Sequence, residues 1–190
     1  MKSHWFEKSF AYDGSQLRSL FGYMQAGVLG DSIVAWRGAC DVGFDKMVDG
    51  EDLRAKEKIC GSDMVHFIVE KFQPHLSFSV ALQRLLATIV KDVVEESAPN
   101  ARDKLLRIGD DIYLDGSPRK KLSISIATVS PVSALVHFAV NVSNTGTPVP
   151  TCCLEDLKIA PEAFARNVMT RYSAEIDSLD QASQKVFWVR

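Results

Sequence analysis

The fold is decided by one stretch of the sequence, Gly109-Asp110-Asp111-Ile112-Tyr113-Leu114-Asp115-Gly116-Ser117-Pro118-Arg119-Lys120-Lys121-Leu122-Ser123-Ile124-Ser125. Residues 111–114 and 121–129 are rich in apolar and β-branched side chains, and they flank the turn sequence Asp115-Gly116-Ser117-Pro118. An Asp-Gly turn between two such runs predicts a β-hairpin. A further β-rich segment, residues 132–142, follows. We expect these strands to be antiparallel neighbours in one sheet.

Two long helices are expected on either side of this block. After Ser77, apolar residues recur every three or four positions as far as Val94, and Pro99 prevents continuation. Pro161 suits the first turn of a last helix, whose apolar stripe reaches Leu179. Because helices and strands do not alternate regularly, the sequence predicts an α+β fold with a mixed or antiparallel sheet and not a doubly wound parallel one.

The first half of the chain predicts shorter elements. They are a strand over residues 4–12, a helix after Ser15, a strand over residues 32–36, a helix capped by Asp49 and a helix begun by Ser62. In the last of these helices, His66 and Glu70 would share a face. A polar side-chain contact and a metal or acid–base role are both open for this pair. The end of the chain, residues 185–190, is expected to return as a strand.

Composition indicates a single globular domain spanning residues 1–190. Apolar residues make up 46% of the sequence and charged residues 24%, which is typical of a folded protein with a real core. The formal charge of -2 disfavours nucleic acid as a partner. No apolar run approaches the roughly 20 residues that span a bilayer, and the N-terminus has no secretory h-region. We therefore expect a cytoplasmic protein with no membrane partner.

The four cysteines do not form a disulfide framework or a metal pattern. Cys40, Cys60, Cys152 and Cys153 are scattered in a chain without a secretion signal, so we expect them to be reduced. Neither a C-x-x-C nor an H-x-x-x-H spacing occurs. We therefore expect no metal site, although a zinc site built from cysteines and His66 stays open.

The hairpin resembles the core of the lipoate and biotin ligases, in which an Asn-Asp element leads through a turn glycine to a lysine. The resemblance implies a biotin/lipoate protein ligase-like fold. It also implies that Asp111 contacts the substrate and that Lys121 matches the catalytic lysine. In these families that lysine contacts an acyl-adenylate or pairs with a cysteine in octanoyl transfer. A lysine on a rigid strand edge can hold its ammonium against a developing oxyanion. The alternative is that Arg119, Lys120 and Lys121 form a solvated loop tip.

The resemblance continues through Val136-His137-Phe138-Ala139-Val140-Asn141-Val142, which is similar to the His-Gly-x-x-x-Asn-Val strand of the octanoyltransferases. It implies that His137 and Asn141 contact substrate. Phe138 replaces the glycine, however, and the spacing is one residue shorter. A histidine within an apolar strand is also typical of a satisfied core residue.

A catalytic cysteine follows this strand in the octanoyltransferases, and Cys152 and Cys153 lie in a comparable place. A cysteine beside a lysine ammonium would have a lowered pKa and could carry a thioester-bound acyl group. The other interpretation is that both are small semi-buried hydrophobic residues.

Three further positions bear on the resemblance. Arg37 with Gly38 resembles the Gly-Arg element of lipoate ligases, which implies a carboxylate or phosphate binder, and a surface ion pair is the alternative. The ligases wrap the adenylate with an arginine- and glycine-rich loop, but residues 56–63 contain a single glycine. Ile124 stands where the ligases have a glycine, so its side chain could close part of the pocket.

The chain also resembles an uncharacterised conserved prokaryotic family, typified by Tyr12-Asp13-Gly14-Ser15-Gln16-Leu17 and Met64-Val65-His66-Phe67-Ile68-Val69-Glu70. Together the resemblances imply an acyl or cofactor transferase or ligase that acts on a small carboxylic acid such as lipoate, octanoate or biotin. ATP with Mg²⁺ would be the cofactor of the ligase route. An acyl carrier or a lipoyl-type domain would be the acceptor. The competing hypothesis is a noncatalytic ligand-binding or regulatory module on the same fold.

Overall fold

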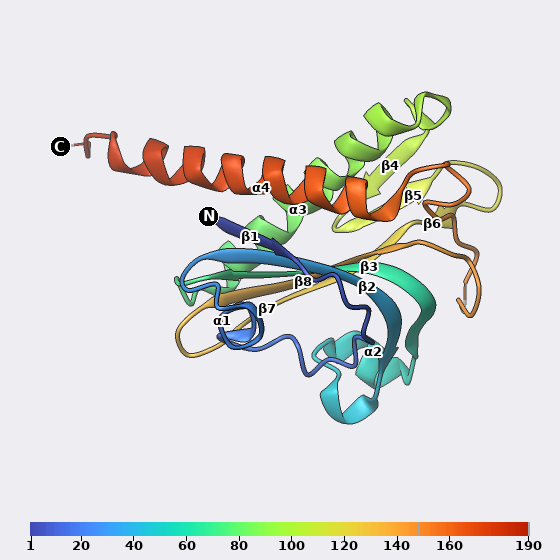
Figure 1. Cartoon of the computed structure of the whole chain (residues 1–190), viewed down its shortest axis with the longest axis horizontal. Helices are drawn as coiled ribbons and strands as arrows, with labels where there is room; N and C mark the ends of the chain where they lie inside the picture. The colour runs from blue at the N-terminus through green and yellow to red at the C-terminus, as the bar shows by residue number, and fades with distance from the viewer. Residues whose placement is uncertain (148, 190) are drawn as a thin grey trace.

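The computed structural model describes residues 1–147 and 149–189 and has the α+β architecture that the sequence predicts (Figure 1). A five-stranded sheet has the order β1 (Lys2–Trp5), β2 (Ser32–Val42), β3 (Ile59–Lys71), β8 (Ala134–Asn141) and β7 (Ser123–Val129). β1 runs parallel to β2, and the other neighbours are antiparallel. The sheet is therefore mixed.

A second, three-stranded sheet holds the predicted hairpin. Its strands are β4 (Leu105–Ile108), β5 (Asp111–Leu114) and β6 (Lys120–Lys121), in that order. The hairpin is shorter than expected, because the chain leaves this sheet after Lys121 and joins the main sheet as β7. The physical reason is the side chain of Leu122, which is fully buried in the core, although its backbone N–H still donates to the Ile112 carbonyl at 2.8 Å. Burying this side chain draws the strand inward.

Two long helices, α3 (Leu76–Ser97) and α4 (Pro161–Gln184), cover one face of the main sheet (Figure 1). Both helices confirm the prediction made from the spacing of apolar residues, and Pro161 lies in the first turn of α4. Side chains alternate between the two faces of a strand. Ala35, Phe67 and Phe138 accordingly lie in the core beneath the helices.

The opposite face of the sheet carries a second apolar cluster, which includes Trp36, Met64 and Ile68. Two chain segments pack beneath it, as Figure 1 shows: one with α1 (Phe21–Ala26), the other with η1 (Phe44–Lys46) and α2 (Gly50–Ala55). Asp49 caps α2 as predicted. At Gly38 the chain passes so close that an added Cβ would lie 1.9 Å from the Phe10 carbonyl oxygen, so only glycine fits there.

Four expectations for local structure were wrong. The helix expected after Ser15 begins only at Phe21, with Leu20 and not Ser15 at its N-cap. His66 and Glu70 lie on β3 and not on a helix, and both face the second apolar cluster without contacting each other. β1 ends at Trp5, and of the predicted strand over residues 4–12 only Tyr12 pairs again, in an isolated bridge to Cys40. Of the strand expected over residues 185–190, residues 185–189 form no strand, and Arg190 lies outside the described residues. The short 3-10 helix η2 (Pro99–Ala101) follows α3.

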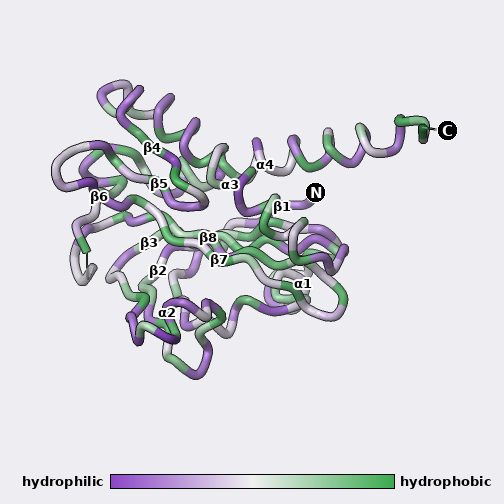
Figure 2. Tube along the Cα trace, turned by 180° about the vertical axis from the view of Figure 1, so that it is seen from behind, coloured by the Kyte–Doolittle hydropathy of each residue, from purple (hydrophilic) through white to green (hydrophobic). Residues whose placement is uncertain are grey.

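The tube in Figure 2 shows the last turns of α4 reaching beyond the body of the protein and ending in an apolar tail. The tail residues Val186, Phe187, Trp188 and Val189 are strongly exposed. Within the described ranges, none of the helices combines the length and the hydrophobicity that a membrane span requires.

Candidate functional site

A cavity of about 360 Å³ lies between the second face of the main sheet and residues 46–60. Its volume falls within the usual range of small-molecule sites. Part of the lining is apolar, from Val42, Met47, Ile59, Met64, Ile124 and Ile126. The polar part comes mainly from residues 46–60 and from β5, β6, β7 and β8. Ile124 narrows the cavity without closing it, whereas Phe138 faces the helices and takes no part in it.

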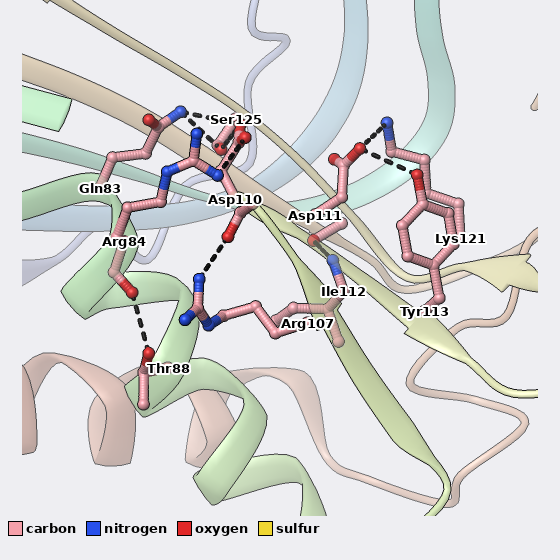
Figure 3. A network of polar contacts seen from close by, with 12 residues as sticks. Gln83, Arg84, Thr88, Arg107, Asp110, Asp111, Ile112, Tyr113, Lys121 and Ser125 are labelled. Carbon is pink, nitrogen blue, oxygen red and sulfur yellow. Dashed lines mark hydrogen bonds and ion pairs between the residues drawn. The ribbon is translucent and has the colours of Figure 1, made fainter. Parts of the chain in front are cut away.

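Four of the predicted site residues line this cavity, namely Asp111, Lys121, His137 and Asn141. Lys121 and Tyr113 are directly opposite each other on β6 and β5. Lys121 Nζ lies 2.9 Å from Asp111 Oδ2, and the Tyr113 hydroxyl donates to the same oxygen at 3.0 Å (Figure 3). The ammonium has three donors. Asp111 therefore orients Lys121 and leaves donors for a ligand.

The neighbouring Asp110 anchors the turn that presents Asp111. Asp110 accepts from Gln83 Nε2 at 2.9 Å and from Arg84 Nη1 at 2.8 Å, both on α3, and from Ser125 Oγ at 2.7 Å (Figure 3). These bonds tie the turn between β4 and β5 to a core helix and to β7. Lys121 is consequently presented from a braced hairpin, and the loop-tip alternative does not describe it.

Asn141 acts as a clamp behind Lys121. Its side-chain amide donates to the Lys121 carbonyl at 3.1 Å and to the Cys152 carbonyl at 3.2 Å. Both donors are used within the protein, so the amide holds β6 and the following loop in place.

Arg37 does not reach the cavity. Its neighbour Trp36 points to the cavity face of the sheet, so Arg37 points to the other face. There its guanidinium forms an ion pair with Asp63, with the Arg37 side chain 46% exposed. Arg37 therefore forms the surface ion pair that was the alternative interpretation of the sequence. It does not lie beside Lys121.

The two adjacent cysteines also lie away from the cavity lining. Cys152 is 1% exposed and belongs to the core beneath the helices, where its thiol contacts the Lys120 carbonyl. Burial raises the pKa of Cys152 to about 11 and also raises the pKa of Cys153. A buried thiol with a raised pKa is a poor nucleophile. These cysteines behave as the small hydrophobic residues of the alternative interpretation.

His137 belongs to a buried aromatic group that the sequence did not reveal. Its ring stacks on Tyr12 with 3.6 Å between ring centroids, and its Nε2 lies 3.1 Å from His66 Nδ1. His66 Nε2 lies 3.2 Å from the Gly38 carbonyl oxygen. Burial lowers the pKa of His66 to about 4, and burial together with His66 lowers that of His137. Treating residues 64–70 as a strand would have placed His66 on the same face as Met64 and Ile68.

Charged side chains complete the cavity lining. The described residues contribute carboxylates from Asp49, Glu51, Asp52, Glu57, Asp110 and Asp111, and ammonium groups from Lys46, Lys58 and Lys121. Lys46 is already ion-paired with Asp13. Burial, followed by the charge of Asp49, raises the pKa of Asp52. Residues 1–147 and 149–189 contain no group of three or more His, Cys, Asp and Glu side chains arranged to hold a metal ion.

Comparison with known proteins gives close relatives that have no assigned activity. The sequence model of the family described as "Domain of unknown function (DUF366)" matches residues 1–187. The uncharacterized protein MJ0805 of Methanocaldococcus jannaschii is 34% identical over 181 residues, covering 92% of this chain and 79% of MJ0805. The solved structure of a protein of unknown function from Pyrococcus horikoshi is 41% identical with a TM-score of 0.91, covering 100% of this chain and 99% of that one.

More distant solved structures are ligases. The biotin protein ligase from Aquifex aeolicus, in complex with biotin and ATP, has a TM-score of 0.57 at 15% identity, covering 93% of this chain and 73% of the ligase. LipL1 of P. falciparum, in complex with lipoate, has a TM-score of 0.56 at 9% identity, covering 98% and 63% respectively. At such identities the likeness concerns the fold alone.

Proposed function

This chain belongs to the DUF366 family and has the fold of the biotin and lipoate ligases, and from that premise we propose that it binds a small carboxylic acid at Lys121 as an acyl or cofactor transferase or ligase. The partner in that reaction is an acyl carrier or lipoyl-type acceptor domain.

The observation that carries the proposal is the position of Lys121 in the cavity wall. Its side chain is 28% exposed, and Asp111, itself bonded to Tyr113, holds the ammonium in place. A carboxylate or acyl carbonyl in the cavity can accept a charge-assisted hydrogen bond from the remaining donors. Such a bond is stronger in a partly dry cleft than in water, and it strengthens further as an oxyanion develops.

The apolar part of the lining suits the rest of such a ligand. Ile59, Met64, Ile124 and Ile126 can pack against an alkyl chain or a small ring. Each methylene removed from water would contribute about 0.8 kcal/mol. An acid with an apolar body therefore fits this cavity better than a small hydrophilic acid.

The lining of this cavity supports neither of the two activation routes. The route through Cys152 or Cys153 is not supported, since neither lines the cavity; the cysteine in its lining is Cys60. The nucleotide route meets a lining with six carboxylates and three lysines, which repels a bare polyphosphate. ATP thus does not fit the described residues by itself, and we assign it no step.

These same features favour a second candidate, a noncatalytic binding or regulatory module that keeps the fold and the acid site. The two candidates share the binding of the acid at Lys121. They differ in whether the acid is ever activated or transferred.

Thermal-shift and mass-spectrometric screening with lipoate, octanoate and biotin, each with and without ATP and Mg²⁺, tests both candidates. A stabilising shift that disappears in Lys121→Ala supports acid binding. Lys120→Ala is the matched control, because Lys120 is exposed on the same strand and does not line the cavity. A covalent or activated product supports the enzyme. No shift with any of the acids would leave the proposal without support.

A further inference from the structure

Two buried side chains in the cavity wall have polar atoms without a hydrogen-bond partner among the described residues. Tyr12 and His137 are 3% and 2% exposed, and both line the cavity. Within residues 1–147 and 149–189, the fully buried side-chain polar atoms that lack a hydrogen bond are Glu95 Oε1 and Ser173 Oγ. The Tyr12 hydroxyl and His137 Nδ1 also make no hydrogen bond within these ranges, but they do not belong to this set of fully buried atoms. Both atoms therefore reach the open space of the cavity.

A chain of hydrogen bonds decides which nitrogen of His137 carries the proton. The Gly38 carbonyl can only accept, so His66 Nε2 must donate to it. His66 is fully buried, which keeps its ring neutral, so its Nδ1 has no proton. Nδ1 of His66 then accepts from Nε2 of His137. A neutral His137 is left with a lone pair on Nδ1, the atom that reaches the cavity.

We propose that His137 Nδ1 is a fixed hydrogen-bond acceptor for the ligand, and that His66 is the positioning residue that fixes its tautomer. Because this rests on the proposed binding of a carboxyl group at Lys121, it narrows the substrate class. The ligand is a carboxylic acid whose far end carries an N–H donor, such as an ammonium, amide or ureido group. The methyl end of a simple fatty acid would leave the acceptor unsatisfied.

The spacing along β8 agrees with a ligand held at both ends. Asn141, whose amide bonds to the Lys121 carbonyl, and His137 are four residues apart on the cavity face of β8. Four residues of a strand span roughly 13 Å. An extended acid with a chain of several methylenes spans much of that distance, with its carboxyl group at the Lys121 donors that Asp111 leaves free.

The charge of the lining favours the same class of ligand. Six carboxylates face three lysines among the described lining residues. Lys46 and Lys121 are paired with Asp13 and Asp111, and Asp110 is paired with Arg84, which leaves four lining carboxylates and Lys58. A ligand with an ammonium or another N–H group is attracted by this surplus of negative charge, whereas a purely anionic ligand is repelled.

Three probes that differ in one group at a time test the proposal: octanoate, 8-aminooctanoate and octylamine. We expect isothermal titration calorimetry to show that 8-aminooctanoate binds the parent protein at least about tenfold more tightly than octanoate, the ratio that one hydrogen bond to a charged donor supplies. The ratio should disappear in His137→Phe and persist in part in His137→Gln, whose amide oxygen can accept. Lys120→Ala should behave like the parent.

The tautomer is tested separately by ¹⁵N NMR on the labelled full chain, which has only four histidines. The His137 signals are assigned by their loss in His137→Gln. A protonated Nε2 and an unprotonated Nδ1 are expected in the parent, and this pattern should be lost in His66→Phe. A protonated Nδ1 in the parent would overturn the proposal even if a variant failed to fold.

The binding outcomes separate this proposal from the proposed function. Equal affinity for octanoate and 8-aminooctanoate, or a ratio that survives in His137→Phe, overturns the role of His137 and leaves acid binding standing. Binding of 8-aminooctanoate and octylamine that depends on His137 but is unchanged in Lys121→Ala overturns the carboxyl site and retains the acceptor. No binding by either amine overturns the acceptor.

Discussion

Replacing Asp110 with alanine tests whether α3 braces the turn that presents Asp111. The change removes three acceptor contacts, with Gln83 at 2.9 Å, Arg84 at 2.8 Å and Ser125 at 2.7 Å. The Arg84 pair is partly exposed and contributes under about 1 kcal/mol. Gln83 and Ser125 also bond to each other at 2.9 Å, so the loss at each is partial, about 1 to 1.5 kcal/mol. We expect the free energy of unfolding to fall by about 2 to 4 kcal/mol.

Urea unfolding followed by circular dichroism measures this loss. Asp115→Ala is the matched control, because Asp115 lies in the same hairpin and its side chain is 57% exposed, with an ion pair to Arg119 at 3.6 Å. That change should stay within about 0.5 kcal/mol of the parent. Equal losses for the two variants, or a loss below about 1 kcal/mol for Asp110→Ala, would refute the bracing role of the network.

Other expectations follow from burial. In the folded protein the thiol of Cys152 should resist a thiol reagent such as DTNB at pH 8 and react after unfolding, because burial raises its pKa to about 11; rapid reaction in the folded state would contradict this. Gly38→Ala should lower the unfolding free energy by more than about 2 kcal/mol, since the new Cβ would meet the Phe10 carbonyl, and a parent-like urea midpoint would exclude that close approach. The pKa of His66 is about 4 folded and 6.5 in its ordinary state, so the unfolded chain binds more protons between these values, and stability should fall as the pH drops through this window. His137 acts in the same direction, and a flat pH profile in urea titrations would count against both.

The long helices and the hairpin could be predicted because their signals are local. An apolar residue every three or four positions buries one side of a helix, and Pro161 suits only a first turn. Likewise, the Asp-Gly pair between two β-rich runs marks the loop of residues 115–119 that joins β5 to β6. Such features depend on a few neighbouring residues, so the sequence expresses them directly.

The error at β3 has a different origin. A strand buried on both faces is apolar at successive positions, so it lacks the alternation that distinguishes a strand from a buried helix. Residues 64–71 are all buried, because β2 and β8 pair on either side and both faces are covered. Only the presence of those neighbours decides the conformation of this segment and, with it, the place of His66.

The candidate site also combines features that follow from local sequence with features that depend on tertiary contacts. The sequence by itself determined that Lys121 follows a turn, that Asp111 precedes it, and that Arg37 neighbours a large apolar residue. Only the tertiary structure decided that Arg37 points away from the cavity, that Cys152 is sealed in the core, and that the Tyr12 ring stacks on His137. Local propensity involves adjacent residues, whereas these contacts join segments far apart along the chain. They exist only once the strands have paired and each side chain has been assigned to one face of the sheet.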